Sequence, residues 1–304
     1  MKQAGIDDII AAERLPPSYR AMVDRWWQPL ARQIGEWNND AGRPIIVGVN
    51  GAQGSGKSTI CRFLASLLLP EIGLSAVVVG LDDLYLPSKA RERLARDIHP
   101  LFRTRGVPAT HDIELGLSIL DDLAGGRQAL IPRFSKALDD RLPQSDWMRH
   151  SGNVDVVLFE GWCVGARPQD EADLVAPINI LEAEEDKGAV WRTHVNDALR
   201  TSYARCFSVI DHMIMLKPPS FDHVLQNRLL QEHKLRALTP DAAGIMRDEE
   251  VRRFVNHYER LTRHMFADLP DRVDLLFSLD AGQDVMSCSR AGLRDMKERD
   301  GHVG

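Results

Sequence analysis

The sequence predicts an α/β fold, a doubly wound parallel sheet with helices on both of its faces. Short apolar runs alternate along the chain with segments whose apolar residues recur at helical spacing, which is the pattern of alternating strands and helices. Each predicted strand is apolar nearly throughout, as expected for strands that are buried on both faces. The predicted strands are 43–51, 74–83, 153–161, 212–217 and 274–279, and the predicted helices are 18–38, 57–69, 189–206, 220–237 and 248–267.

The composition is that of an ordinary globular protein. The chain has 304 residues, of which 44% are hydrophobic and 27% are charged, and its formal net charge is −6. An acidic balance argues against sequence-independent binding to nucleic acid, which needs a basic surface to replace the counterions of phosphate. We therefore expect no nucleic-acid partner.

The cysteines, the N-terminus and the apolar runs indicate in which cellular environment the protein works. Cys61, Cys163, Cys206 and Cys288 lie far apart in the sequence, so they predict neither a disulfide framework nor a zinc site. The N-terminus lacks the basic start and apolar stretch of a signal peptide. The longest apolar runs have strand length, far below the roughly 20 residues that span a bilayer. We expect a cytoplasmic protein with no membrane association.

The chain is expected to form one main domain with two appendages. Residues 1–42 are predicted to be an N-terminal helical extension, residues 43–282 the main domain, and residues 283–304 a C-terminal tail. The extension contains Trp26, Trp27 and Trp37 among apolar residues at helical spacing. That pattern favours packing on the main domain, and a partner-binding site is the alternative.

A glycine-rich loop between the first predicted strand and the next helix carries the strongest signal. Residues 51–58 read GAQGSGKS and match GxxxxGK[ST], the P-loop, in the strand-loop-helix context that the motif requires. In such a loop backbone N–H groups surround phosphate oxygens, the lysine reaches the β- and γ-phosphates, and the hydroxyl binds Mg²⁺. The predicted ATP-binding residues are Gly51, Ala52, Gln53, Gly54, Ser55, Gly56, Lys57, Ser58 and Thr59.

The remaining sequence narrows the class of nucleotide-binding protein. It has no NKxD-type base-reading motif, which GTPase switches need, and no LSGGQ-like signature of ABC-type ATPases. Two classes remain. One is a kinase that transfers the γ-phosphoryl group to a small molecule, and the other is a nucleotide-dependent binding module.

Carboxylates follow the second and third predicted strands. Asp82 and Asp83 close the second strand, and Glu160 closes the third. Because carboxyl ends of parallel strands share one edge of the sheet, these groups are expected beside the P-loop. Asp82 is the predicted base for the acceptor hydroxyl group, and Glu160, with Ser58, is the predicted site for Mg²⁺. A turn or cap role for the aspartates and a merely solvated Glu160 are the alternatives.

Five segments, in this order and at these separations, resemble one kinase family. They are GVNGAQGSGKST, LDDLYL, HPLFRTRGVPATHD, IPRFSKALDDR and VVLFEGW. Together they resemble the D-glycerate 3-kinases of plants and fungi and their bacterial relatives, within the group of P-loop kinases that includes phosphoribulokinase, uridine kinase and pantothenate kinase. The resemblance covers roughly residues 44–280. It implies a P-loop NTPase-type sheet, the use of ATP and Mg²⁺, and Asp82 as the base.

The resemblance also implies where the acceptor binds. Glycerate needs a cation for its carboxylate, and Arg105, Arg133 and Lys136 are available, with an arginine preferred for two parallel hydrogen bonds. The segment RGVPATHD has Ala109 where the family pattern RGxPGTHD has glycine. The predicted substrate residues are Asp83, Tyr85, Arg105, Thr110, His111, Asp112, Arg133 and Lys136. Helix capping by Thr110 or Asp112 is the alternative for the 110–112 segment.

The resemblance also implies a lid over the phosphates at about 226–250, where this group of kinases carries an arginine-bearing segment. Arg228 is the predicted transition-state cation, with Lys234 and Arg236 behind it, and a solvated helix face is the alternative. The expected function is phosphorylation of D-glycerate to 3-phosphoglycerate with ATP. The alternatives are a P-loop kinase for a nucleoside, pantothenate or another sugar acid, and a non-catalytic nucleotide-binding regulatory protein.

Overall fold

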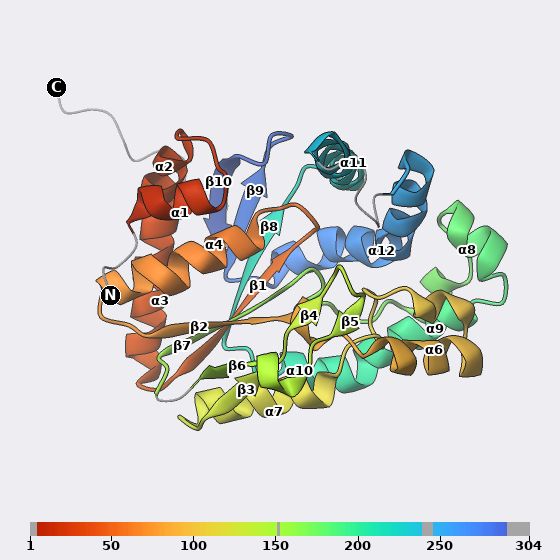
Figure 1. Cartoon of the computed structure of the whole chain (residues 1–304), viewed down its shortest axis with the longest axis horizontal. Helices are drawn as coiled ribbons and strands as arrows, with labels where there is room; N and C mark the ends of the chain where they lie inside the picture. Colours follow the sequence, from red (N-terminus) through yellow and green to blue (C-terminus); the bar gives the residue numbers. More distant parts are fainter. Residues whose placement is uncertain (1–4, 151–152, 239–245, 291–304) are drawn as a thin grey trace.

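A six-stranded sheet lies between helical layers in the computed structural model, which describes residues 5–150, 153–238 and 246–290 (Figure 1). The strand order is β10-β9-β8-β1-β7-β2, and every pairing is parallel except that of β10 with β9. The five parallel strands are β1 (Ile45–Gly51), β2 (Ala76–Gly80), β7 (Val156–Gly161), β8 (His212–Lys217) and β9 (Leu275–Leu279). All five predicted strands and the α/β fold are confirmed.

The sheet separates two apolar cores. Along β7, Val156 and Leu158 point into one core and Val157 and Phe159 into the other, as the two-residue period of a strand requires. Helices α3 (Gln28–Ala41) and α4 (Lys57–Phe63) cover the first core. Helices α7 (Ile113–Ala124), α10 (Ala204–Phe207) and α12 (Asp248–Asp268) cover the second core.

The predicted helices are present, and three of them contain a π-helical turn. The helix after the P-loop continues from α4 through the π turn Leu64–Leu68 into α5 (Leu69–Glu71). The other two are α2 (Tyr19–Met22), Val23–Trp27 and α3, and then α9 (Val190–Ala198), Leu199–Tyr203 and α10. The remaining helices of the described chain are α1 (Ile6–Ala12), α6 (Ser88–Asp97), α8 (Ile180–Glu185) and α11 (Phe221–Leu238), with short 3₁₀ turns between elements.

The N-terminal helices pack on the main sheet. Trp27 is 2% exposed, and its ring lies 5.3 Å from that of Phe277 on β9. Trp26 meets the same phenylalanine edge-on, and Ile34 is buried in the same core. The contacts of Trp26 and Trp27 are therefore those that the predicted packing on the main domain requires. Trp37 stacks on the ring of His212 at a centroid distance of 4.1 Å.

An edge strand lies in the segment that was expected to be a tail. Strand β10 (Val285–Arg290) pairs antiparallel with β9. Only Val285 of VMSCSR is buried, so the sequence shows no buried-strand pattern. An edge strand needs few apolar residues, which is why periodicity did not reveal it.

Two small hairpins are inserted between α7 and β7. Strands β3 (Ala129–Ile131) and β6 (Met148–His150) pair with each other, and between them lies the hairpin of β4 (Phe134–Ser135) and β5 (Asp140–Arg141). In Figure 1 this second hairpin lies below the P-loop, on the side where the strands end. The insert brings the IPRFSKALDDR segment to the edge of the sheet.

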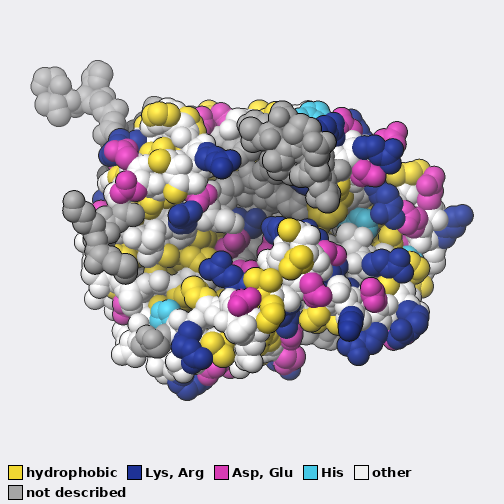
Figure 2. Space-filling model, viewed as in Figure 1, with side chains coloured by type: hydrophobic (Ala, Val, Ile, Leu, Met, Phe, Trp, Pro, Cys, Tyr) yellow, Lys and Arg dark blue, Asp and Glu magenta, His cyan; other side chains and the backbone are white. Residues whose placement is uncertain are grey.

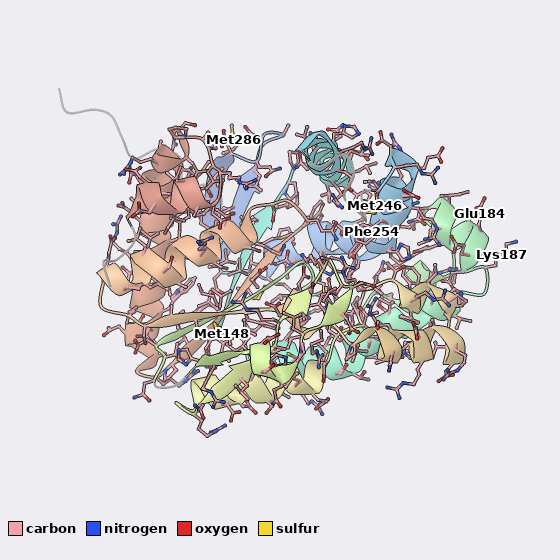
Figure 3. All side chains as sticks on the ribbon, viewed as in Figure 1. Met148, Glu184, Lys187, Met246, Phe254 and Met286 are labelled. Carbon is pink, nitrogen blue, oxygen red and sulfur yellow. The ribbon has the colours of Figure 1, made fainter. Side chains whose placement is uncertain are left out.

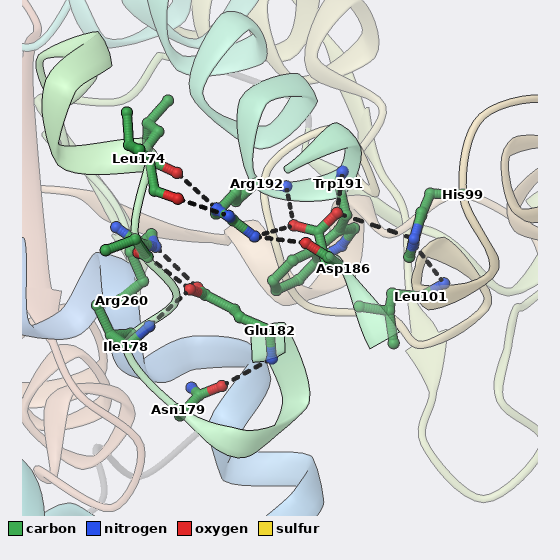
Figure 4. A network of polar contacts seen from close by, with 12 residues as sticks. His99, Leu101, Leu174, Ile178, Asn179, Glu182, Asp186, Trp191, Arg192 and Arg260 are labelled. Atoms are coloured by element: carbon green, nitrogen blue, oxygen red, sulfur yellow. Dashed lines mark hydrogen bonds and ion pairs between the residues drawn. The ribbon is translucent and has the colours of Figure 1, made fainter. Parts of the chain in front are cut away.

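A buried ionic network holds the segment between β7 and α9 against α12 (Figure 4). The Arg260 guanidinium group donates to both carboxylate oxygens of Glu182, at 2.7 and 2.6 Å. Arg192 pairs with Asp186 at 2.9 Å. All four side chains are nearly buried, so losing one partner would leave a charge without compensation. The network therefore fixes α12 relative to α8 and the segment that follows α8.

No helix among the described residues is both long and apolar enough to cross a membrane.

We expect Trp27→Ala to lower the free energy of unfolding by about 3–5 kcal/mol, because it removes a fully buried aromatic side chain from the core. The measurement is urea unfolding followed by circular dichroism. The control is Val190→Ala, since Val190 is 50% exposed and its loss should change stability by no more than about 0.5 kcal/mol. Equal stability of the two variants would contradict the packing of the N-terminal helices described above.

Candidate active site

The ends of β1, β2 and β7 bring the P-loop and two carboxylates together. The strands are in register, with Gly80 opposite Glu160 and Asn50 opposite Gly161. The Lys57 ammonium nitrogen lies 3.9 Å from a carboxylate oxygen of Glu160. Figure 2 shows a hollow in the middle of this face, with acidic and basic side chains inside it.

The P-loop has a conformation that depends on glycine. Gly54 and Gly56 have φ values of 78° and 84°, which side chains with a Cβ rarely adopt. A Cβ at Gly51 would lie 2.3 Å from the Ser55 hydroxyl oxygen. That oxygen is buried and has no hydrogen-bond partner among the described residues. An orphaned hydroxyl beside a helix N-terminus fits a loop that receives phosphate oxygens.

Ser58 and Glu160 form the predicted pair of oxygen donors. The Ser58 hydroxyl donates to Glu160 Oε1 at 2.7 Å. Burial raises the pKa of Glu160, while the charge of Lys57 and the Ser58 hydrogen bond oppose that rise. Among the described residues no group of three or more His, Cys, Asp or Glu could hold a metal ion. One carboxylate and one hydroxyl group fit Mg²⁺ that is held mainly by nucleotide phosphates and water.

Asp82 is fixed by two polar contacts. Its carboxylate accepts a hydrogen bond from the Tyr85 hydroxyl group at 2.8 Å and pairs with the Lys136 ammonium group at 2.8 Å. Burial favours the protonated form, but the charges of Lys136 and Lys57 and the two hydrogen bonds outweigh it and lower the pKa of Asp82 to about 2. Asp82 is therefore ionised at neutral pH and held close to a cation.

Asp83 has a different task from its neighbour. Strand β2 ends at Gly80, so both aspartates lie on the 3₁₀ turn Leu81–Leu84 rather than on the strand. Asp83 Oδ1 accepts from the backbone N–H of Phe134 at 3.0 Å. Burial raises its pKa, and that hydrogen bond opposes the rise. Asp83 thus joins the β4–β5 hairpin to the end of β2.

The β4–β5 hairpin is held by further side chains. Asp140 accepts from the backbone N–H and the hydroxyl group of Ser88 at 3.0 and 2.9 Å. Arg141 donates to the carbonyl oxygens of Leu84 and Tyr85 at 3.1 and 2.9 Å. These bonds fix the hairpin against the turn that carries Asp82. They place Lys136, the residue after β4, beside the predicted base.

The three candidate cations for the acceptor carboxylate lie in different settings. The Arg105 guanidinium group pairs with Asp139 and lies 5.6 Å from the centre of the Phe134 ring. Arg133 is exposed at the start of the hairpin. Lys136 alone of the three contacts a carboxylate at the ends of the strands.

The 110–112 segment makes contacts within the protein. Thr110 is completely buried, and its hydroxyl donates to Val107 O at 2.6 Å. His111 Nδ1 lies 2.5 Å from the Tyr203 hydroxyl oxygen. Asp112 is the N-cap of α7, with its carboxylate accepting from Leu115 N, which confirms the capping alternative for that residue.

Arg228 pairs within its own helix. Its guanidinium group lies 2.6 Å from the buried carboxylate of Glu232, one turn later on α11. Arg236 donates to Met246 O at 2.7 Å. The predicted lid, 226–250, includes residues 239–245, which lie outside the described residues, as does the side chain of Lys234. On the described part, Ala52 of the P-loop shares a small apolar cluster with residues of α11 and α12: Phe221, Val224, Val251 and Val255.

Two aromatic residues of the site were missed by the sequence analysis. Tyr258 on α12 donates from its hydroxyl group to Arg105 O at 3.0 Å, and Trp162 Nε1 donates to Gly106 O at 2.8 Å. A Cβ at Gly106 would lie 1.9 Å from the Tyr258 hydroxyl oxygen. The glycine at 106 was the available signal, since it permits this close approach. The two aromatics fix the backbone of the RGVPATHD segment.

Comparisons with known proteins show which proteins this chain is similar to. No protein-family model matches the chain. The uncharacterized kinase mug58 of Schizosaccharomyces pombe is 34% identical over 227 residues, which cover 71% of this chain and 79% of that protein. The solved D-glycerate 3-kinase from Cryptococcus neoformans var. grubii is 27% identical with a TM-score of 0.69, covering 82% of this chain and 90% of that one. The chain belongs to the D-glycerate 3-kinase family of P-loop kinases.

A plant member of the family is longer than this chain. The chloroplastic D-glycerate 3-kinase of Arabidopsis thaliana is 28% identical over 225 residues, which cover 71% of this chain but 46% of the plant protein. The chain is a P-loop kinase. The region that it shares with the plant protein, 225 residues, has nearly the same length as the region of 227 residues that it shares with the fission-yeast kinase.

One departure from the family pattern has a visible backbone consequence. Ala109, where the D-glycerate 3-kinase pattern has glycine, has a φ of 78°. This left-handed conformation is free of cost for glycine and strained for alanine. The backbone at this position is therefore the one that a glycine would adopt, even though the side chain differs.

We expect His111 to make the protein less stable as the pH falls from 6.5 toward 3. Burial lowers the pKa of His111 from 6.5 to about 3, so in this range the unfolded chain binds a proton that the folded protein does not. The loss is about 2 kcal/mol at pH 5. In His111→Asn, the difference in free energy of unfolding between pH 7 and pH 5, measured with urea, should shrink by that amount. An unchanged difference would contradict the buried neutral histidine.

Proposed function

We propose that this P-loop kinase phosphorylates D-glycerate at its 3-hydroxyl group, with ATP as the donor and Mg²⁺ as the metal ion. One observation carries the proposal. A carboxylate that can accept a hydroxyl proton, Asp82, lies beside a cation, Lys136, and within the field of the P-loop Lys57. An acceptor with a hydroxyl group and a carboxylate matches this pair of groups.

The residues of the site have separable roles in the proposed reaction. The acceptor oxygen bonds to the γ-phosphorus as the bond from that phosphorus to the ADP oxygen breaks, and the hydroxyl proton passes to Asp82. Lys57 stabilises the negative charge on the phosphoryl oxygens. Bound Mg²⁺, which Ser58 and Glu160 would hold with the phosphates, neutralises phosphate charge. Arg228 becomes available to the phosphoryl group if it leaves Glu232.

Other acceptors form the second candidate function. Pantothenate is also a hydroxy acid, so it would meet the same Asp82 and Lys136. A nucleoside has no negative group for Lys136, and a non-catalytic binding protein has no use for a base beside the P-loop. The geometry at Asp82 therefore favours a hydroxy acid over these two.

The experiment is ATP consumption by the purified protein with Mg²⁺ and one acceptor at a time. D-Glycerate, L-glycerate, ribulose 5-phosphate, uridine and pantothenate are compared, and ³¹P NMR of the product distinguishes 2- from 3-phosphoglycerate. Stimulation by D-glycerate with formation of the 3-phosphate supports the proposal. Preference for another acceptor, or ATP hydrolysis that ignores every acceptor, contradicts it.

We expect Asp82→Asn and Lys57→Ala to differ in their effects on nucleotide binding. Asp82→Asn removes only the proton acceptor, so turnover should fall by about 10²–10⁴-fold while ATP affinity stays nearly unchanged. Lys57→Ala should weaken both ATP binding and turnover. Calorimetric titration with a non-hydrolysable ATP analogue and steady-state kinetics measure the two quantities.

The control for these variants is Asp146→Asn, an exposed aspartate outside the site. It should leave both ATP binding and turnover at the wild-type level. Full turnover in Asp82→Asn would rule out Asp82 as the base, and full ATP affinity in Lys57→Ala would rule out the assigned role of the loop.

A further inference from the structure

The predicted base, Asp82, is covered by a cation. The Lys136 ammonium group lies 2.8 Å from Asp82 Oδ2, on the carboxylate that has to receive the acceptor proton. A carboxylate paired in this way is a weak base, because the cation stabilises its ionised form. Catalysis at Asp82 therefore needs a way to move the cation.

We propose that Lys136 selects acceptors that carry a negative charge, by leaving Asp82 to pair with the acceptor's anionic group and so freeing Asp82 to accept the hydroxyl proton. This inference rests on the proposed kinase function and adds to it the residue that recognises the acceptor's charge and the way in which that recognition frees the base. It replaces the sequence-based preference for an arginine as the partner of the carboxylate.

Two arginines beside the hairpin have other partners. Asp139, at the tip of the hairpin, pairs with both Arg105 and Arg91. Arg91 is 1% exposed and also donates to the carbonyl oxygen of Arg103 at 2.8 Å. Arg105 thus ties the hairpin tip to the RGVPATHD segment, and Arg91 ties the tip to the backbone at Arg103. Drawing Arg105 toward an acceptor would break contacts that fix the site.

Lys136 is able to move while its backbone stays in place. Its side chain is 66% exposed, so the ammonium group can rotate on its four-carbon stem through solvent. The backbone before it is tied by Phe134 N to Asp83, and the strand after the turn is tied by Asp140 to Ser88. A fixed hairpin with a mobile cation keeps the ammonium group within reach of both Asp82 and an acceptor.

When Lys136 moves from Asp82 to the acceptor's carboxylate, its ammonium group remains in an ion pair. An acceptor carboxylate offers Lys136 an ion pair of the same kind as the one it leaves, so the cost of separating Lys136 from Asp82 is offset. Asp82 keeps the hydrogen bond from the Tyr85 hydroxyl group, which holds its orientation. An uncharged alcohol offers no such pair, so with it the cation stays on Asp82. Discrimination then acts on turnover as well as on binding.

The test compares acceptors that differ in charge. Wild type and Lys136→Met are assayed with D-glycerate and with glycerol, which has a hydroxymethyl group in place of the carboxylate. In Lys136→Met we expect the preference for D-glycerate over glycerol in kcat/KM to fall by about tenfold or more, with a higher KM for D-glycerate. Glycerol turnover should be faster, because no cation covers Asp82. Lys136→Arg should recover most of the preference.

The matched control is Lys187→Gln. Lys187 is exposed on the loop after α8, far from the hairpin (Figure 3), so its loss should leave both acceptors unaffected. Equal loss of activity toward D-glycerate and glycerol in Lys136→Met would indicate a merely structural role and overturn the proposal for Lys136, while the kinase function would stand.

A different acceptor would separate the two proposals. If the wild type prefers pantothenate, the D-glycerate assignment fails, and pantothenate is compared with its uncharged alcohol, panthenol, in the same variants. A tenfold loss of that preference in Lys136→Met supports the role of Lys136. A wild-type protein that prefers uridine to every anionic acceptor, or that uses no acceptor, overturns both proposals.

Discussion

The parallel alignment of β1, β7 and β2 is the constraint on which the site depends. These strands end at one edge of the sheet, so the P-loop, Glu160 and the turn with Asp82 meet there although they lie far apart in the sequence. Both apolar cores serve this alignment, since alternate residues of each strand are buried on opposite sides. The polar groups of the site are thus positioned by apolar packing behind them.

Charges around the site are matched in pairs. Lys57 lies near Glu160, Lys136 pairs with Asp82, Arg105 with Asp139 and Arg228 with Glu232. Such pairing lets several ionised groups lie close together in a partly buried hollow. Under the proposal for Lys136, an anionic acceptor binds by exchange of ion-pair partners rather than by filling a cationic cavity, and rearrangement of side chains is part of its binding.

The strands and the P-loop could be predicted because each has a local pattern. Continuous apolar runs indicate strands that are buried on both faces, and the motif GxxxxGK[ST] indicates a phosphate-binding loop between a strand and a helix. Strand β10 could not be predicted this way, since an edge strand with Val285 as its one buried residue has no such pattern. The partners of Lys136 and Arg105 also could not be predicted, because they depend on where an inserted hairpin folds back against a distant turn. Tyr258 lies about 150 residues from its partner for the same reason.

The contact of Ala52 with α11 and α12 has a mechanical consequence. Phe221, Val224, Val251 and Val255 pack with this P-loop residue in one apolar cluster. A close-packed cluster does not deform in one place alone, so a shift of the loop is shared with both helices. The state of the nucleotide loop and the position of the helix that carries Arg228 are therefore linked thermodynamically, and each favours a matching state of the other.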